Sequence, residues 1–146
     1  SAAYSSPKYS FEKIHLNPKP LASGGIPLWI SGTLNKNVLR RIVRFGSGWI
    51  PWGPDALDPI GSLAKIAEEM EKGGRDMEGF QAGSYLQVVE DGGKIDVAAT
   101  MGPVAAMAEA GITDFRATLN LPNEEAAVQD MLSPLVEAFR SAAGRS

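Results

Sequence analysis

The sequence predicts an α/β fold built on parallel (β/α) units. Short apolar runs typical of buried strands alternate with longer amphipathic stretches typical of helices, and this alternation occurs four times between Pro27 and Phe139. Each connection between successive strands is long enough to cross over a sheet, as a parallel pair requires. Alternating units of this kind define the α/β class.

The composition sets limits on the class of protein. The 146 residues suffice for one domain, expected to span 1–146 with residues 1–26 as a lead-in segment, and 44% hydrophobic with 21% charged residues is typical of a soluble globular chain. A net charge of -3 offers no basic surface for nucleic acid or membrane lipid. No apolar run approaches the ~18 residues of a membrane span. Cysteine is absent, which is compatible with the expected cytoplasmic location.

The elements of the first half follow from local patterns. Residues 1–10 are expected to be loose, 10–16 to form a short strand, and the proline-rich 17–27 to form a loop. The run Pro27–Ser31 predicts the first buried strand. A helix is then expected from its apolar face, which comprises Leu34, Val38, Leu39, Ile42 and Val43. Gly46 is expected to end it in the left-handed conformation.

The second half continues the alternation. Gly48–Trp52 predicts a strand, Asp58 and Pro59 the start of a helix, and Gly79–Glu90 a third strand followed by a turn at residues 91–94. Residues 96–111 are expected to be helical with a division at Gly102–Pro103. The last unit combines a strand at Thr113–Asn120, a helix capped by 122–125 and a kink at Pro134.

Four units fit two architectures. One is an open parallel sheet with helices on both faces, and the other is half of an eight-unit barrel. The residue pattern leaves both open, although chain length alone favours the open sheet.

The step Ser31–Gly32–Thr33 is the main candidate for binding. It joins the carboxyl end of a strand to the amino end of a helix, where α/β proteins bind ligands. Free N–H groups, the helix dipole and two hydroxyls suit a phosphate. The alternative is an ordinary turn capped by Thr or Asn.

Other polar and aromatic residues have both ligand and structural interpretations. Trp49 and Trp52 are both of a kind that most often fills a core or barrel. Trp52, with Gly53, is the better candidate of the two to line a flat aromatic ligand. Arg116 either pairs with Asp114 or holds an anion. The single histidine, His15, is expected to be a surface residue. No catalytic triad, phosphate-binding glycine loop or metal cluster is present in the sequence, so any catalysis would depend on a cofactor.

Several segments together resemble the luciferase-like monooxygenases, which use flavin or deazaflavin. They are Pro18–Lys19–Pro20, Pro27–Gly32, Val38–Arg44, Ser47–Pro51, Gly73–Gly83 and Glu109–Pro122, in the order in which the family has them. The chain departs from the family at Ser31, where glycine is usual, and at Ser47, where aspartate is usual.

The resemblance implies the carboxyl-terminal half of a TIM (β/α)8 barrel, strands five to eight. It implies an oxidoreductase or monooxygenase that uses FMN or coenzyme F420 on a small organic substrate, with Ser31, Gly32, Thr33 and Trp52 at the cofactor. The family's substrate-acting residues lie mostly in the other half, so no catalytic residue is assigned and the chain alone is expected to be inactive. It implies a homo-oligomer or pairing with a missing amino-terminal half. The alternative is a non-catalytic half-barrel that serves binding or assembly.

Overall fold

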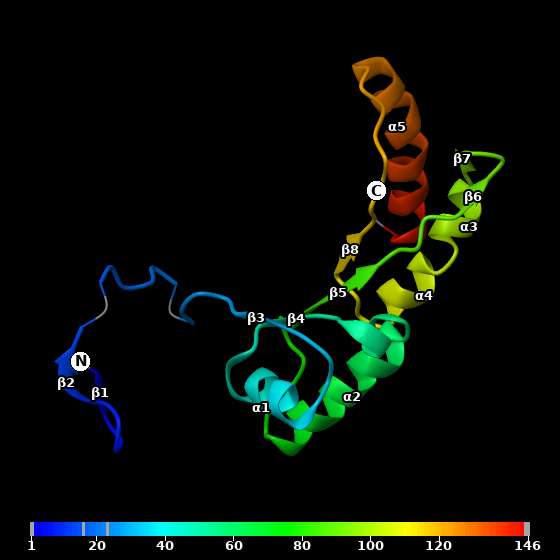
Figure 1. The fold of residues 1–146 in the computed structure, drawn as a ribbon. Helices are drawn as coiled ribbons and strands as arrows, with labels where there is room; N and C mark the ends of the chain where they lie inside the picture. Colours follow the sequence, from blue (N-terminus) through cyan, green and yellow to red (C-terminus); the bar gives the residue numbers. More distant parts are fainter. Residues whose placement is uncertain (1, 16, 23, 145–146) are drawn as a thin grey trace.

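The computed structural model describes residues 2–15, 17–22 and 24–144, and its centre is a four-stranded parallel sheet. The strands are β3 (Trp29–Ser31), β4 (Gly48–Ile50), β5 (Gln81–Tyr85) and β8 (Asp114–Arg116) (Figure 1). They lie side by side in the order β3-β4-β5-β8, and every neighbouring pair is parallel. The predicted α/β class with a parallel sheet is therefore confirmed.

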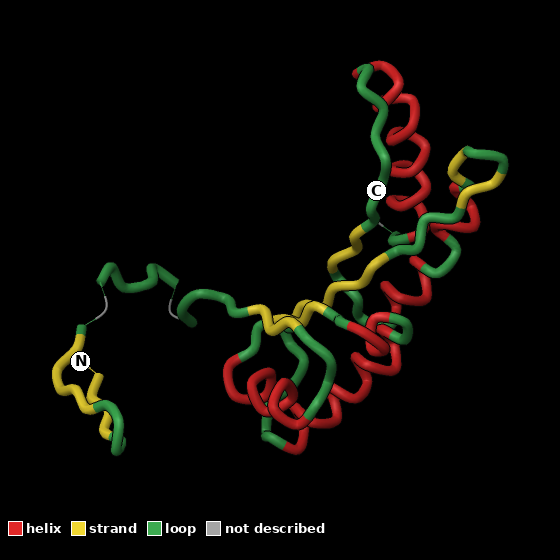
Figure 2. The backbone as a smooth tube through the Cα atoms, in the orientation of Figure 1, coloured by secondary structure: helices red, strands yellow, loops and turns green. Residues whose placement is uncertain are grey.

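The helices gather on one face of this sheet, as the separate colours of Figure 2 show. They are α1 (Lys36–Phe45), the 3-10 turn η1 (Gly53–Ala56), α2 (Pro59–Lys72), α3 (Val97–Met101), α4 (Val104–Glu109) and α5 (Glu125–Ala142). Right-handed crossovers between strands that follow one another in chain order place successive helices on the same face. A sheet covered on both faces needs a reversal of strand order, and this order has none.

The two faces of the sheet differ in what covers them. Alternate residues of each strand face the layer of helices, and we call this face of the sheet the helix side. Its residues are Ile30, Trp49, Ala82, Ser84 and Phe115. The other residues of the strands lie on the opposite face, which we call the open face. They are Trp29, Ser31, Ile50, Gly83, Tyr85, Asp114 and Arg116. Parallel sheets are normally covered on both faces. In this sheet Tyr85 is 46% exposed, so the open face lacks its usual cover within the part of the chain that the structure describes.

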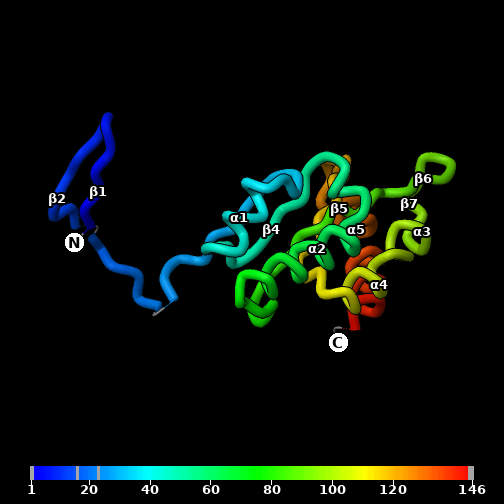
Figure 3. Tube along the Cα trace, turned by 90° about the horizontal axis from the view of Figure 1, so that it is seen from below, coloured from blue at the N-terminus to red at the C-terminus, as the bar shows by residue number. Residues whose placement is uncertain are grey.

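Two short antiparallel hairpins accompany the sheet. The first joins β1 (Ala2–Ser5) to β2 (Ser10–Ile14), so the expectation of a loose segment at 1–10 was wrong. Its turn is closed by Ser6, whose N–H donates to the Tyr9 carbonyl at 2.8 Å and whose hydroxyl oxygen accepts from the Tyr9 N–H at 3.0 Å. The hairpin lies apart from the sheet in two views (Figures 1 and 3).

The second hairpin shortens the predicted third strand. The ladder with β8 ends at Tyr85, and the chain then forms β6 (Glu90–Asp91) and β7 (Lys94–Ile95). Gly92 and Gly93 both have positive φ, which the tight turn between these strands requires. The predicted turn at 91–94 is therefore confirmed, whereas the strand predicted for Gly79–Glu90 covers only Gln81–Tyr85.

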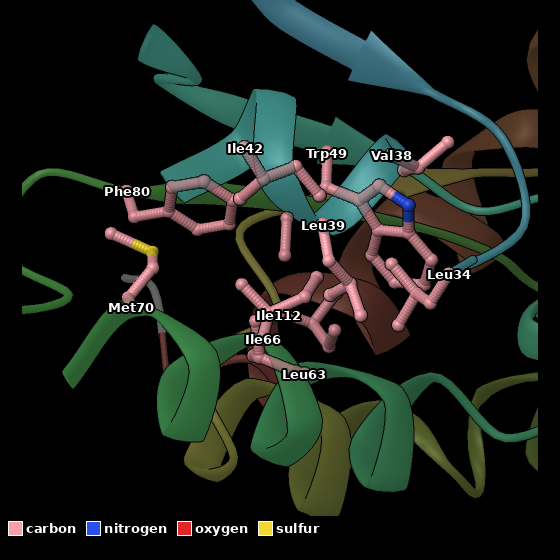
Figure 4. Packing of buried hydrophobic residues seen from close by; sticks show 11 residues of the cluster. Leu34, Val38, Leu39, Ile42, Trp49, Leu63, Ile66, Met70, Phe80 and Ile112 are labelled. Carbon is pink, nitrogen blue, oxygen red and sulfur yellow. The ribbon is translucent and has the colours of Figure 1, made fainter. Parts of the chain in front are cut away.

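The main core lies between the sheet and the first two helices. The predicted apolar face of α1 packs against Trp49 and against α2 (Figure 4). Trp49, Ile42, Ile66 and Met70 have no exposed surface. Burial of side chains of this size stabilises the fold by about 1.5 to 3 kcal/mol each.

A second apolar cluster, between β8, α3 and α5, is less closed. Its buried members are Leu86, Met101, Val104 and Leu135, whereas ten neighbours stay partly exposed, among them Leu132 and Phe139. The rings of Phe115 and Phe139 meet edge to face with their centroids 5.3 Å apart. This end of the sheet leaves apolar surface in contact with solvent.

The helix boundaries follow the capping residues. The Asn35 side chain accepts from the N–H groups of Asn37 and Val38, and Asp58 accepts from Gly61 as predicted. Helix α1 ends at Gly46, but not in the left-handed conformation, because its φ is -70°. Glycine is needed there for space: a Cβ would lie 2.8 Å from the Ile42 Cα atom. No helix in the described ranges is long and apolar enough to cross a membrane.

Arg75 holds the far end of α1. Its Nη1 donates to the carbonyls of Ile42 and Val43, both at 2.9 Å, and its Nη2 donates to the Gly46 carbonyl at 3.0 Å. The Ile42 carbonyl also accepts from the Gly46 N–H at 2.9 Å, so Arg75 is a second donor to it. The carboxyl end of a helix, where the dipole favours a positive charge, suits this guanidinium group. Arg75 follows α2, so it also ties the second unit to the first.

We expect Arg75→Ala to lower the free energy of unfolding by about 2 to 3 kcal/mol, because it removes three charged hydrogen bonds to main-chain carbonyls at the end of α1. Urea unfolding followed by circular dichroism measures the change. The matched control is Arg40→Ala, on the exposed side of α1. Equal stability of the two variants would contradict the anchoring role of Arg75.

Candidate functional site

The carboxyl ends of β3 and β4 meet at one corner, where all four predicted site residues lie. The Gly32 N–H donates to the Ile50 carbonyl at 3.2 Å, which extends the ladder into the turn. A Cβ on Gly53 would lie 3.0 Å from the Thr33 Cγ2 atom. The turn after β3 and the Trp52–Gly53 segment after β4 are therefore neighbours. We call Ser31, Gly32, Thr33, Trp52 and Gly53 the rim corner.

The core fixes the shape of the rim corner. The buried Trp49 indole donates from Nε1 to the Gly32 carbonyl at 3.0 Å. Gly32 has a φ of 140°, which favours glycine, and a Cβ there would lie 3.3 Å from the Val38 Cγ2 atom. The hydrophobic core and the turn are thus directly coupled.

Several main-chain donors of the rim corner are already occupied. The Leu34 N–H donates to the Asp55 carboxylate at 2.6 Å, and the Asn35 N–H donates to the Thr33 carbonyl at 2.8 Å. Within the described part of the chain, the N–H groups of Thr33 and Lys36 have no hydrogen-bond partner. A phosphate at this corner would therefore be held by these two donors and by the hydroxyls of Ser31 and Thr33.

Two charged residues at the corner were missed from the sequence. Asp55, in η1, also accepts from the Ser62 hydroxyl at 3.5 Å, so it joins η1, α2 and the turn after β3. Lys65 looks like a solvent-facing charge in the sequence, but its Nζ donates to the Leu34 carbonyl at 3.1 Å. Neither belongs to a recognisable motif, because both reach the turn from residues more than twenty positions away. Their opposite charges flank the same residue.

The two tryptophans of the second unit have different environments. Trp49 is fully buried in the core, whereas Trp52 is 65% exposed beside the rim corner. The exposed ring is available to lie against a flat ligand. Its neighbour Gly53 has a φ of 58°, which lets the chain turn sharply after β4.

Further along the same rim, Arg116 on β8 is paired. Its Nε donates to the Asp114 carboxylate at 2.6 Å, which raises the pKa of the guanidinium above its ordinary value. Tyr85 lies directly opposite Arg116 across the ladder. Of the two roles expected for Arg116, the structure shows the pairing with Asp114.

Metal chemistry has no support among the described residues. No group of three or more His, Cys, Asp or Glu side chains lies close enough together to hold an ion there. His15, the single histidine, is exposed, as expected.

Comparison of the chain with models of protein families, with curated proteins and with solved structures finds no match. Function is therefore proposed from the geometry of the chain itself and from the resemblance of its motifs.

We expect Asp55→Ala to lower the free energy of unfolding by about 1 to 3 kcal/mol, because it leaves the Leu34 N–H without its charged acceptor. Amide hydrogen exchange should also become faster at Leu34. Asp91→Ala, in the exposed hairpin turn, serves as the control. Unchanged exchange at Leu34 in the Asp55 variant would show that the contact does not hold the turn.

Proposed function

We propose that the chain is the cofactor-binding half of a luciferase-like (β/α)8 oxidoreductase, with FMN or coenzyme F420 at the rim corner. The observation that carries the proposal is the meeting of Ser31–Thr33 with Trp52 at the carboxyl end of a parallel sheet. Barrel enzymes place their ligands at this rim. The ordered resemblance of the motifs names the cofactor class.

The half-barrel part of the proposal rests on the strand order. Four parallel strands in chain order, with helices on one face, correspond to half of an eight-unit barrel. Two sheet edges, β3 and β8, then stay unpaired, and unpaired edges favour association with further strands. Four more β/α units would pair both edges and would cover the open face.

The rim corner offers a small set of hydrogen-bond donors to a phosphate-bearing cofactor. The hydroxyls of Ser31 and Thr33 and the N–H groups of Thr33 and Lys36 would hold the phosphate, at the positive end of α1. Trp52 would lie against the tail or the ring system. Asp55 already occupies the Leu34 N–H, so its role is to fix the turn, and the ammonium group of Lys65 holds the Leu34 carbonyl.

FMN or coenzyme F420 would supply the redox chemistry on a small organic substrate. The role of this chain is to bind and orient the cofactor at the rim. No described residue of the chain is assigned an acid, base or nucleophile role. By resemblance, such groups belong to the amino-terminal half, so the chain alone is expected to be inactive.

A non-catalytic half-barrel for binding or assembly is the second candidate. Its supporting observation is that the N–H groups of Gly32 and Leu34 are both taken by groups of the chain. That arrangement stabilises a turn with no ligand. The two candidates differ in one measurable property, which is binding of the cofactor.

Titration of the chain with FMN and, separately, with coenzyme F420 tests the proposal. Binding is expected to quench the fluorescence of the exposed Trp52 and to release heat in calorimetry. Ser31→Ala and Thr33→Val should each weaken binding about tenfold or more, because each removes a hydrogen bond to a charged phosphate. Ser133→Ala, on α5, is the control.

The outcomes separate the two candidates. Binding of one cofactor and not the other names the branch of the family. Absence of binding for both would reject the cofactor role of the chain and would leave the non-catalytic candidate.

A further inference from the structure

An apolar groove runs beside the unpaired edge of β8. It has a volume of about 190 Å³. The lining residues are apolar except for Thr100, and they are Leu86, Val88, Thr100, Met101, Phe115, Ala117, Leu119, Leu132, Leu135, Val136 and Phe139. The helix-side residues of β8 and the extension after it form one wall, and α5 forms another. This groove is the opening of the incompletely closed second cluster.

The opposite edge of the sheet carries exposed apolar side chains. The Ser47 N–H donates to the Leu28 carbonyl at 2.8 Å, so the hydrogen bonds between the first two strand segments begin one residue before β3. Leu28 has the same parity as Ile30 and therefore belongs to the helix side, yet it is 47% exposed. The preceding Ile26 is 72% exposed. The β3 edge thus presents apolar side chains that no helix in the described ranges covers.

The groove and this edge are complementary. A right-handed crossover from β8 to a next parallel strand would pass through α5, so α5 would cover the junction between β8 and that strand. Helix-side residues of the added strand would then point into the groove. Leu28, which directly precedes β3, and Ile30 of β3 are apolar and of the correct parity for this position.

We propose that two copies of this chain associate edge to edge, with β8 of each copy against β3 of the other, into a closed eight-stranded barrel. The inference rests on the half-barrel part of the proposed function and is independent of the cofactor. Two copies supply eight strands, leave no free edge and enclose the open face. A second copy is the favoured partner because the chain itself carries both complementary edges.

The register at the junction follows from barrel closure. Ser31, Ile50, Gly83 and Asp114 lie in one row across the sheet, given the observed pairs Ser31–Ile50, Trp49–Ala82 and Gly83–Asp114. A barrel of eight strands with a shear of eight shifts the register by about four residues over half its circumference. The shift in one direction puts Ser31 opposite Ala110, at the end of α4, where no strand can pair. The other direction puts Ser31 of one copy opposite Thr118 of the second, after β8.

Light scattering and sedimentation equilibrium of the chain test the association. A dimer is expected in the absence of any cofactor. Leu28→Asp should convert it to a monomer by placing a charge at the junction, and Val136→Asp in the groove should do the same from the other side. Ile60→Asp, at a similarly exposed residue of α2, should stay dimeric. Circular dichroism verifies that each variant is folded, and a folded monomer in the parent chain would overturn the proposal.

Cross-linking tests the register, because the chain has no cysteine of its own. Ser31→Cys and Thr118→Cys are made in separate chains, mixed and oxidised. A mixed disulfide should form at high yield, since paired strands bring Cα atoms to about 5 Å, within reach of a disulfide. The Ser31→Cys chain alone should form none. A dimer without the mixed disulfide would overturn the proposed pairing of β8 with β3. Cofactor binding is tested by the separate titration, so failure of one proposal can be told from failure of the other.

Discussion

The order of the strands is the constraint on which the rest of the structure depends. Because β3, β4, β5 and β8 follow one another in space as they do in sequence, every right-handed crossover places its helix on the same face. That layer of helices buries Trp49 and the apolar side of α1, while the opposite face of the sheet and both of its edges stay uncovered. The same order brings the carboxyl ends of β3 and β4 together, which creates the rim corner.

The rim corner is rigid because the core reaches it. The indole of Trp49 is an apolar filler on one side and a hydrogen-bond donor to Gly32 on the other. Asp55 and Lys65 then fix Leu34 from the second unit. The positions proposed to contact a ligand are thus set by buried and cross-unit contacts rather than by the turn itself, as precise binding sites require.

Local patterns predicted most of the fold and part of the site. The helix faces, the Asp58 cap, the division at Gly102–Pro103 and the burial of Trp49 depend on periodicity and backbone chemistry, which neighbouring residues determine. The conformation of Gly46, the hairpin at 2–14 and the contacts of Asp55, Lys65 and Arg75 were not predicted. The three side-chain contacts depend on which distant segments meet, and a short pattern contains no information on that. The strand order β3-β4-β5-β8 likewise required the structure.

Three contacts that hold this molecule together share a chemical property. Arg75 donates to carbonyls at the end of α1, Trp49 donates to the Gly32 carbonyl, and Asp55 accepts from the Leu34 N–H. Each anchor recognises the main chain of its partner segment, and the main chain is the same whatever side chains it carries. A change of side chain at Val43 or Leu34 therefore does not by itself remove these contacts, whereas the three anchors cannot be exchanged without penalty. Gly32 and Gly46 are restricted for a different reason, because a Cβ at either position would crowd α1.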